Sequence, residues 1–211
     1  MPRPGHQKNS RSMLDPKQAI FPRKQPRQGR SAATYEAILE AAARILEREG
    51  PEGLTTNLAA ELAGVSVGSL YQYFPSKEAI IAELIRAMRD QMLADLTDAA
   101  ASLQDAPINV AVERLVAASI RHHADRPALA RVLEAAQPML PLHAETAARE
   151  AEIQALIMRT LKGYGVADPD QVAFDLIALT KGMVDAAAQA GAQDFAAVQA
   201  RVVRAARGYL G

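Results

Sequence analysis

The chain has 211 residues, a formal net charge of zero and no cysteine. This length suffices for one or two small domains with a hydrophobic core, and the lack of cysteine excludes disulfides and thiol-based redox chemistry. No uncharged apolar run approaches the roughly 18 residues that a membrane-spanning helix needs. No apolar segment follows the basic N-terminus, as it would in a secretory signal. We therefore expect a cytoplasmic protein with no membrane partner.

The neutral total hides a basic N-terminal arm. Residues 1–30 hold eight Lys or Arg and one Asp, so the arm carries a charge of about +7 and the remainder about −7. Five prolines predict that residues 1–29 are disordered. One interpretation is that the arm contacts a polyanion. Another is that it is a solvated tail without function. A third is that translation truly starts at Met13. Under the first, four cations would contact phosphates or a minor groove: Arg23, Lys24, Arg27 and Arg30.

Apolar residues at helical spacing predict a first helix from about Ser31 to Glu49, which Gly50 and Pro51 end. The stretch 55–77 then predicts two short helices joined by a tight turn. Thr55 caps the first of them, and Gly64 ends it in a left-handed conformation.

Ser66 caps the second short helix, which we expect from Val67 to about Phe74. A helical wheel sorts the residues of this helix into two sides. The inner side holds Val67, Leu70, Tyr71 and Phe74, and the outer side holds Gly68, Ser69, Gln72 and Tyr73. Tyr71 lies at the boundary, so its ring can pack while its hydroxyl reaches outward. Because Gly68 leaves the backbone bare and Ser69 and Gln72 form hydrogen bonds, the outer side suits a DNA major groove.

The run AGVSVGSLYQYFPSKEAI, with Gly50 and Thr55 upstream, resembles the DNA-binding domain of TetR-family transcriptional regulators, over about Arg30 to Leu84. The resemblance implies that the second short helix enters the major groove. It also implies a set of DNA-binding residues: Thr55, Ser69, Tyr71, Tyr73 and Lys77 at phosphates, and Asn57, Val67, Gly68 and Gln72 near base edges. Arg30 joins the predicted DNA-binding residues as one of the four cations named above. The family usually has a bulky aliphatic residue at Ala59, and either Leu58 or Leu62 would fill that space here.

Six further helices are predicted after the motif. The first begins after the cap Ser76 and runs to about Asp98, and its length makes it a lever between the two ends of the molecule. The others span about 108–123, 127–137, 143–163, 169–190 and 194–209. We therefore expect an all-α fold of about nine helices. Its parts are a disordered arm (1–29), a three-helix helix-turn-helix domain (30–76) and a helical ligand-binding and dimerisation domain (77–211).

The last two predicted helices repeat apolar residues at three- and four-residue spacing, which is typical of a packing seam. In the TetR family the corresponding helices pair with those of a second chain, so the resemblance implies a homodimer. The predicted interface consists of Leu176, Leu179, Met183, Phe195, Val198, Val202 and Ala205. The alternative is that this seam is buried within one chain.

The sequence holds no nucleophile elbow, phosphate loop, zinc signature or paired-carboxylate motif. We therefore predict that the protein is not an enzyme and has no cofactor and no metal site. His122, His123 and Asp125 match no metal-binding spacing, and two adjacent histidines are expected to point to different sides of a helix.

The family resemblance implies a cavity for a small-molecule effector in the C-terminal part. Methionine adapts to irregular apolar ligands, so we expect an apolar effector with one or two polar groups. The candidate lining residues are Met88, Met92, Leu115, His122, Met139, Ile157, Met158 and Phe174.

These features together predict a homodimeric transcriptional regulator, a repressor that binds a palindromic operator in double-stranded DNA and is released by a small apolar effector. One alternative is a helical small-molecule-binding protein or enzyme that has lost DNA binding. Another is an activator, which sequence alone does not distinguish from a repressor.

Overall fold

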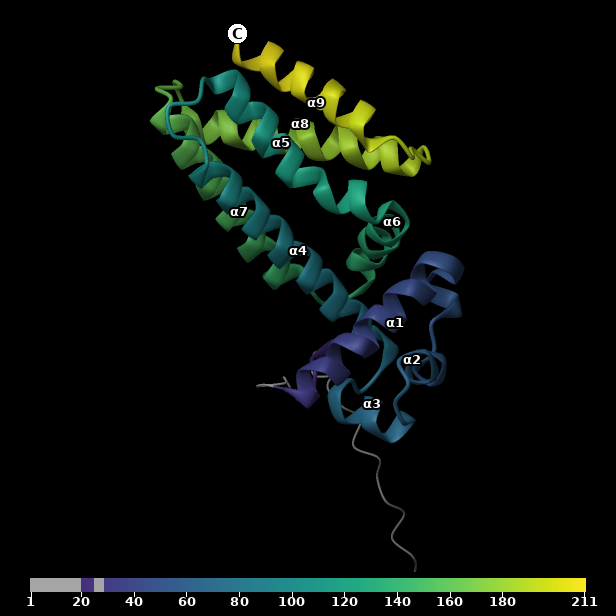
Figure 1. Cartoon of the computed structure of the whole chain (residues 1–211). Coiled ribbons are helices and arrows are strands. Elements are labelled where there is room, and N and C mark those ends of the chain that lie inside the picture. The colour runs from purple at the N-terminus through teal and green to yellow at the C-terminus, as the bar shows by residue number, and fades with distance from the viewer. Residues whose placement is uncertain (1–19, 25–28) are drawn as a thin grey trace, which may run out of the picture.

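The computed structural model describes residues 20–24 and 29–211. In this part of the chain every regular element is a helix, which confirms the predicted all-α class (Figure 1). The nine α-helices are α1 (Arg30–Gly53), α2 (Thr56–Leu62), α3 (Val67–Tyr73), α4 (Lys77–Ala101), α5 (Ile108–Asp125), α6 (Pro127–Ala136), α7 (His143–Gly163), α8 (Pro169–Gln189) and α9 (Phe195–Leu210). A short 3-10 helix, η2 (Gln137–Met139), follows α6.

Three hydroxyl caps set the starts of α2, α3 and α4, as predicted. Thr55 Oγ1 accepts from the backbone N–H of Leu58 at 3.1 Å. Ser66 Oγ accepts from the N–H of Ser69 at 3.0 Å, and Ser76 Oγ accepts from the N–H of Ala79 at 3.2 Å. Each cap satisfies an amide that the first turn of a helix leaves free.

Two glycines with positive φ interrupt α1 and end α2. Gly50 (φ 69°, ψ −171°) interrupts α1, and one further turn follows it. Gly64 (φ 68°) ends α2, and the N–H of Val65 donates to the carbonyl of Ala60 at 3.0 Å. A Cβ atom at Gly64 would meet nothing within 4 Å, so the backbone conformation rather than space requires glycine there.

The first hydrophobic core joins α1–α3 to the start of α4 and to α6. Ile38, Leu70, Phe74 and Ile85 are fully buried in it, and Leu133 of α6 is 1% exposed. Because α6 packs on α1 and shares this core, the helix-turn-helix region and the remaining helices form one continuous structure.

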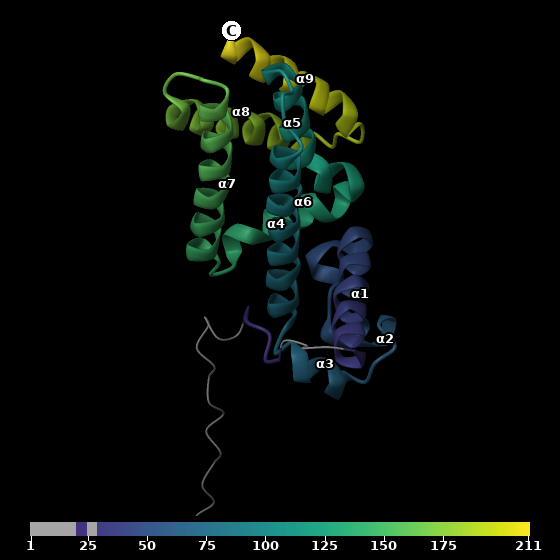
Figure 2. The same cartoon turned by 60° about the vertical axis from the view of Figure 1, so that its left-hand side comes forward.

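The other two cores belong to the C-terminal helices. One joins α5, α8 and α9, and the other joins the second half of α4 to α5, α7 and α8. Figures 1 and 2 show α4 running from α3 at one end of the molecule toward α8 at the other. Helix α4 therefore takes part in both the first and the third core, and it is the longest helix described.

The predicted disorder of residues 1–29 is wrong for residues 20–24. Ile20 is 3% exposed and belongs to the first core, and its carbonyl accepts from Arg86 Nη1 at 3.2 Å. The Arg86 guanidinium also lies 4.7 Å from the ring centroid of Phe21. This apolar pair, set between basic and proline residues, anchors the segment. The rest of the arm, including the predicted phosphate contact of Arg27, lies outside the described residues.

The predicted dimer seam is also corrected by the structure. Phe195, Val198 and Val202 are at most 4% exposed and pack on α5 and α8 of the same chain, so they have no surface left for a partner. The regular spacing of these residues reflects packing inside one chain, which was the alternative interpretation. The other four predicted interface residues are half-buried: Leu176, Leu179, Met183 and Ala205.

None of the helices in the described residues combines the length and the apolarity needed to cross a membrane.

Candidate DNA-binding surface and effector cavity

Helix α3 buries one face and exposes the other. Leu70, Tyr73 and Phe74 lie in the first core, where the ring of Tyr35 stacks on Phe74 with centroids 4.8 Å apart. Ala59 of α2 is fully buried and Leu58 packs against the same core, while Leu62 is 47% exposed. Leu58 therefore fills the space that a larger residue at position 59 would occupy.

The helical wheel placed two α3 residues on the wrong side. Tyr73 was expected outside but is 7% exposed, with its ring edge on Tyr35 at 5.9 Å. Val67 was expected inside but is 37% exposed, whereas Tyr71, expected at the boundary between the two sides, is 40% exposed. Because α3 has only two turns and the core lies under its C-terminal end, the place of a residue along the helix determines its burial more than the helical period does.

The predicted DNA-contacting residues, Tyr73 excepted, reach the surface of this region. Ser69 and Lys77 are half-buried. The exposed ones are Arg30, Thr55, Asn57, Val67, Gly68, Tyr71 and Gln72. They come from the start of α1, the cap of α2, and helices α2 and α3, and they expose backbone, amide, aromatic and cationic groups.

Three hydrogen bonds hold the polar side chains of this surface. The hydroxyls of Tyr71 and Thr56 lie 3.0 Å apart and tie α3 to α2. Lys77 Nζ donates to the carbonyl of Pro51 at 3.3 Å and ties α4 to the end of α1. The hydroxyls of Ser66 and Ser69 lie 2.8 Å apart. The surface is thus organised before any partner binds it.

The described part of the basic arm lies at the C-terminal end of α3. The N–H of Arg23 donates to the carbonyl of Tyr73 at 2.7 Å, and Arg23 Nη1 donates to the carbonyl of Tyr71 at 3.4 Å. A cation is favourable at this end of a helix. The contact brings Arg23 and Lys24, both exposed, next to the outer face of α3.

A cavity of about 430 Å³ lies among α4, α5, α6, α7 and α8, within the range of about 300–1,000 Å³ typical of small-molecule sites. Among the predicted lining residues, Met139 is instead 75% exposed in η2, and Met158 packs against the third core. Those that do line the cavity are Met88, Met92, Leu115, His122, Ile157 and Phe174. Sequence periodicity missed the charged residues of its wall, which include Arg89 and Glu134.

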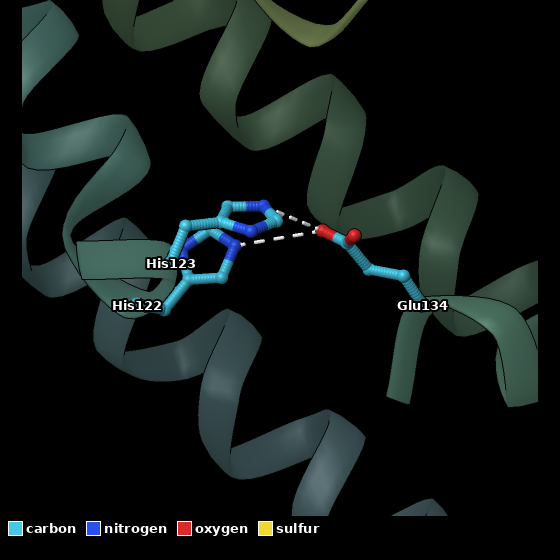
Figure 3. A group of neighbouring side chains, drawn as sticks. All are labelled: His122, His123 and Glu134. Carbon is cyan, nitrogen blue, oxygen red and sulfur yellow. Dashed lines mark ion pairs between the residues drawn. The ribbon is translucent and has the colours of Figure 1, made fainter. Parts of the chain in front are cut away.

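His122, His123 and Glu134 form a polar cluster in the cavity wall (Figure 3). Glu134 Oε1 lies 2.9 Å from His123 Nε2 and 3.6 Å from His122 Nε2. The expectation that the two rings point to different sides is wrong, since their centroids are 4.3 Å apart and both face the carboxylate. They lie in the last turn of α5, from which both side chains reach toward α6.

The electrostatics of the cluster favour an ionised carboxylate. Burial alone would raise the pKa of Glu134, but hydrogen bonds from His122 and His123 outweigh it and lower the pKa to about 2. The three potential ligand atoms lie within 4.8 Å of one another, close enough for one small cation. However, neither Nδ1 atom has a hydrogen-bond partner among the described residues, whereas metal-bound imidazoles are usually oriented by one. The geometry therefore fits an internal ion-pair cluster better than a metal centre.

Arg126 joins the cavity region to the helix-turn-helix region. It lies between α5 and α6, three residues after His123, and its guanidinium donates to both carboxylate oxygens of Glu47 at 2.7 and 2.8 Å. A third hydrogen bond, 2.9 Å long, reaches Glu40. Two parallel N–H···O bonds fix both distance and orientation, so this contact sets how α6 sits on α1.

Comparisons with known proteins match both halves of the chain. Residues 38–84 match the family model of bacterial regulatory proteins of the tetR family, and residues 107–210 match that of the tetracyclin repressor-like C-terminal domain. The chain is 32% identical over 166 residues to the HTH-type transcriptional regulator RutR of Escherichia coli K12, covering 75% of this chain and 77% of RutR. It is 28% identical over 147 residues to an uncharacterised HTH-type transcriptional regulator of Mycobacterium tuberculosis H37Rv, covering 68% of this chain and 69% of that protein.

Solved structures show the same fold at lower identity. A TetR-family transcriptional regulator from Mesorhizobium loti superposes with a TM-score of 0.71 at 20% identity, covering 87% of this chain and 98% of that one. A complex of SmeT with triclosan gives a TM-score of 0.57 at 20% identity, covering 74% of this chain and 80% of that one.

A helix-turn-helix unit joined by a long helix to a helical domain with a cavity defines a ligand-responsive DNA-binding regulator. With two family models matched and a relative above 30% identity, the chain belongs to the TetR family of transcriptional regulators. Proteins of this family regulate transcription and are not enzymes, in agreement with the sequence prediction. They bind DNA, typically as dimers, and respond to small molecules.

The Glu134 cluster should make stability depend on pH. Because the folded-state pKa of Glu134 lies near 2, below its ordinary value of 4.5, its stabilisation is present above about pH 4.5 and is lost as pH falls toward 2. We expect Glu134→Gln to lower the free energy of unfolding by about 2–3 kcal/mol at neutral pH. Urea titrations from pH 7 to pH 3 should show the gap to the wild type narrowing, with the exposed Glu36→Gln as control. A gap that stays constant over this range would contradict the assignment.

The Arg126 contact should stabilise the protein more than an ordinary surface ion pair. Arg126→Ala leaves the carboxylates of Glu40 and Glu47 without their shared partner, and we expect a loss of about 1–2 kcal/mol in the free energy of unfolding. The exposed pair of Arg44 with Glu40, 2.8 Å long, provides the control. Urea unfolding of Arg44→Ala should show only a small fraction of that loss, and equal losses would mean that Arg126 is an ordinary surface charge.

Proposed function

We propose that the protein is a cytoplasmic repressor that binds a palindromic operator as a homodimer and is released when a small, largely apolar effector fills the cavity. The observation that carries this proposal is that α3 has one buried face and one exposed face. One face is sealed in a core that continues into α4, and the other offers Gly68 and Gln72 to a partner. A helix held this rigidly, with exposed hydrogen-bonding groups, suits the major groove.

We propose distinct roles for the exposed residues. Gln72 can pair with adenine N6 and N7, and Val67 can contact a thymine methyl group. Arg30, Thr55, Ser69, Tyr71 and Lys77 would contact phosphates, and Asn57 and Gly68 would lie near base edges. Tyr73 supports the helix from below, since its ring is buried. The docked arm supports phosphate contacts by Arg23 and Lys24 beside α3.

We propose that the dimer forms through the outward faces of α8 and α9. Ala178, Gly182 and Ala186 are exposed at four-residue spacing on α8, and a Cβ atom at Gly182 would meet nothing within 4 Å in one chain. Small residues let two helices approach closely, and half-buried Leu179 and Met183 flank this stripe. Two copies of α3 would then contact successive turns of the operator, which requires a palindrome.

We propose that α4 and the Arg126 contact transmit effector binding. Met88 and Met92 of α4 line the cavity, and the start of the same helix lies in the core beneath α3. An effector that favours one position of α4 and α6 changes the geometry of α1–α3, and thereby the affinity for DNA. The complex of SmeT with triclosan supports an apolar effector by fold-level analogy.

Selection of random duplex DNA by the purified protein at near-physiological salt tests this proposal. We expect a palindrome with half-sites about one helical turn apart. Gln72→Ala should change the recovered bases at one position of each half-site, whereas Arg30→Gln should weaken all sequences alike and reduce the salt dependence by about one phosphate contact.

Recovery of only salt-sensitive, sequence-independent binding would contradict the proposal. It would favour a helical small-molecule-binding protein that has lost specific DNA binding. Equal effects of the two substitutions on specific and random DNA would refute the division of roles between Gln72 and Arg30. The location of the selected palindrome relative to promoters would distinguish a repressor from an activator.

A further inference from the structure

Arg89 is a buried cation without a partner. It lies on α4 with 8% of its surface exposed, and its Nη2 atom has no hydrogen-bond partner in the described part of the chain. No ion pair joins Arg89 to a carboxylate among the described residues. Two other arginines of this region do have carboxylate partners. Arg86 pairs with Glu83 and Glu145, and Arg149 pairs with Asp90 and Glu152. Buried charges in proteins are normally paired, so the exception requires an explanation.

The carboxylates closest to Arg89 are not available to it. Both oxygens of Glu145 accept from Arg86, at 2.6 and 3.1 Å. Glu150 of α7 is exposed and also lines the cavity, but it forms no ion pair within 4.0 Å with Arg89 among the described residues, and its charge acts through space to raise the pKa of Arg89. Burial outweighs that effect and lowers the pKa of the guanidinium, but arginine remains cationic in proteins. Among the described residues, Arg89 is therefore left without a direct ion-pair partner.

Arg89 lies in the wall of the cavity. Met88 and Met92 of the same helix line the cavity beside it, and Leu115, Ile153 and Ile157 contribute further apolar wall from α5 and α7. The carboxylate of Glu134 also belongs to the wall, but it is engaged by two imidazoles. Arg149 and Lys181, the other cations of the wall, form ion pairs with carboxylates. The cavity thus combines a mainly apolar lining with Arg89, a wall cation that has no ion pair among the described residues.

We propose that the effector is an apolar monocarboxylate, with its carboxylate bound by the Arg89 guanidinium and its hydrocarbon part against the methionines and aliphatic residues. This inference rests on the proposed effector cavity and names the class of its ligand. The planar guanidinium matches a carboxylate with two parallel hydrogen bonds. A single negative charge balances Arg89, whereas a phosphate dianion would leave a second charge buried and unpaired.

Isothermal titration calorimetry with three ligands of one chain length tests the proposal without DNA. The probes are decanoate, decanol and decyltrimethylammonium, and the proteins are the wild type, Arg89→Met and Arg159→Met. Arg159 is exposed on α7 and outside the cavity lining, so its variant removes the same charge elsewhere. We expect the wild type and Arg159→Met to bind decanoate about tenfold to a hundredfold more tightly than decanol. Arg89→Met should bind the two ligands equally, with its affinity for decanol unchanged.

A stability measurement separates this role from a purely structural one. If Arg89 is an unpaired buried cation that waits for a ligand, Arg89→Met should raise the melting temperature of the ligand-free protein. Decanoate should then raise the melting temperature of the wild type more than that of the variant. If Arg89 instead serves the fold by pairing with Glu150 in solution, Arg89→Met and Glu150→Gln should both lower the melting temperature, which would contradict the proposal.

The proposal would be overturned by decanol binding as tightly as decanoate, by decanoate binding undiminished in Arg89→Met, or by no binding of decanoate at all. None of them bears on the DNA selection, which uses ligand-free protein. Failure of the carboxylate assignment and failure of the regulator proposal are therefore distinguishable. Tight binding of decyltrimethylammonium would also contradict it, because a cation would then be accepted next to Arg89.

Discussion

The structure depends on the continuity of α4. Its 25 residues form one helix about 37 Å long at 1.5 Å per residue, with neither proline nor glycine inside it. The first turns of α4 are buried beneath α3, and later turns line the effector cavity. A rigid rod shared by two cores cannot shift at one end without moving the other. The Arg126 contact adds a second connection, through α6, between the same two regions.

The local features of the helix-turn-helix region could be predicted from sequence because neighbouring residues determine them. A serine or threonine cap needs only the amide three residues ahead, and a left-handed turn needs only a glycine at the right place. Thr55, Gly64 and Ser66 accordingly have the predicted roles. The helix order and the all-α class followed from breaks such as Gly50 and Pro107, and the family resemblance followed from the density of the α3 motif.

The features that sequence could not predict depend on which helix packs beneath a residue. Val67 and Tyr73 exchange sides because the first core reaches only the C-terminal end of α3. The apolar residues of α9 have the same regular spacing whether they pack on α8 of the same chain or on a second chain. Glu134 meets His122 and His123 only after α6 turns back on α5, and Arg89 looks like any surface arginine in the sequence although the folded chain buries it. Charged residues in a cavity wall are therefore the hardest to predict from the spacing of apolar residues in the sequence.

Inter-protomer distances measured by pulsed electron paramagnetic resonance test the central claim, that filling the cavity changes the geometry of two DNA-reading helices. Because the chain has no cysteine, a single Glu61→Cys on the exposed face of α2 can be spin-labelled alone. The account predicts one narrow inter-protomer distance distribution in the complex with the selected operator. It predicts a displaced distribution when decanoate is added. An identical distribution with saturating bound decanoate, or no coupling between protomers, would contradict the account.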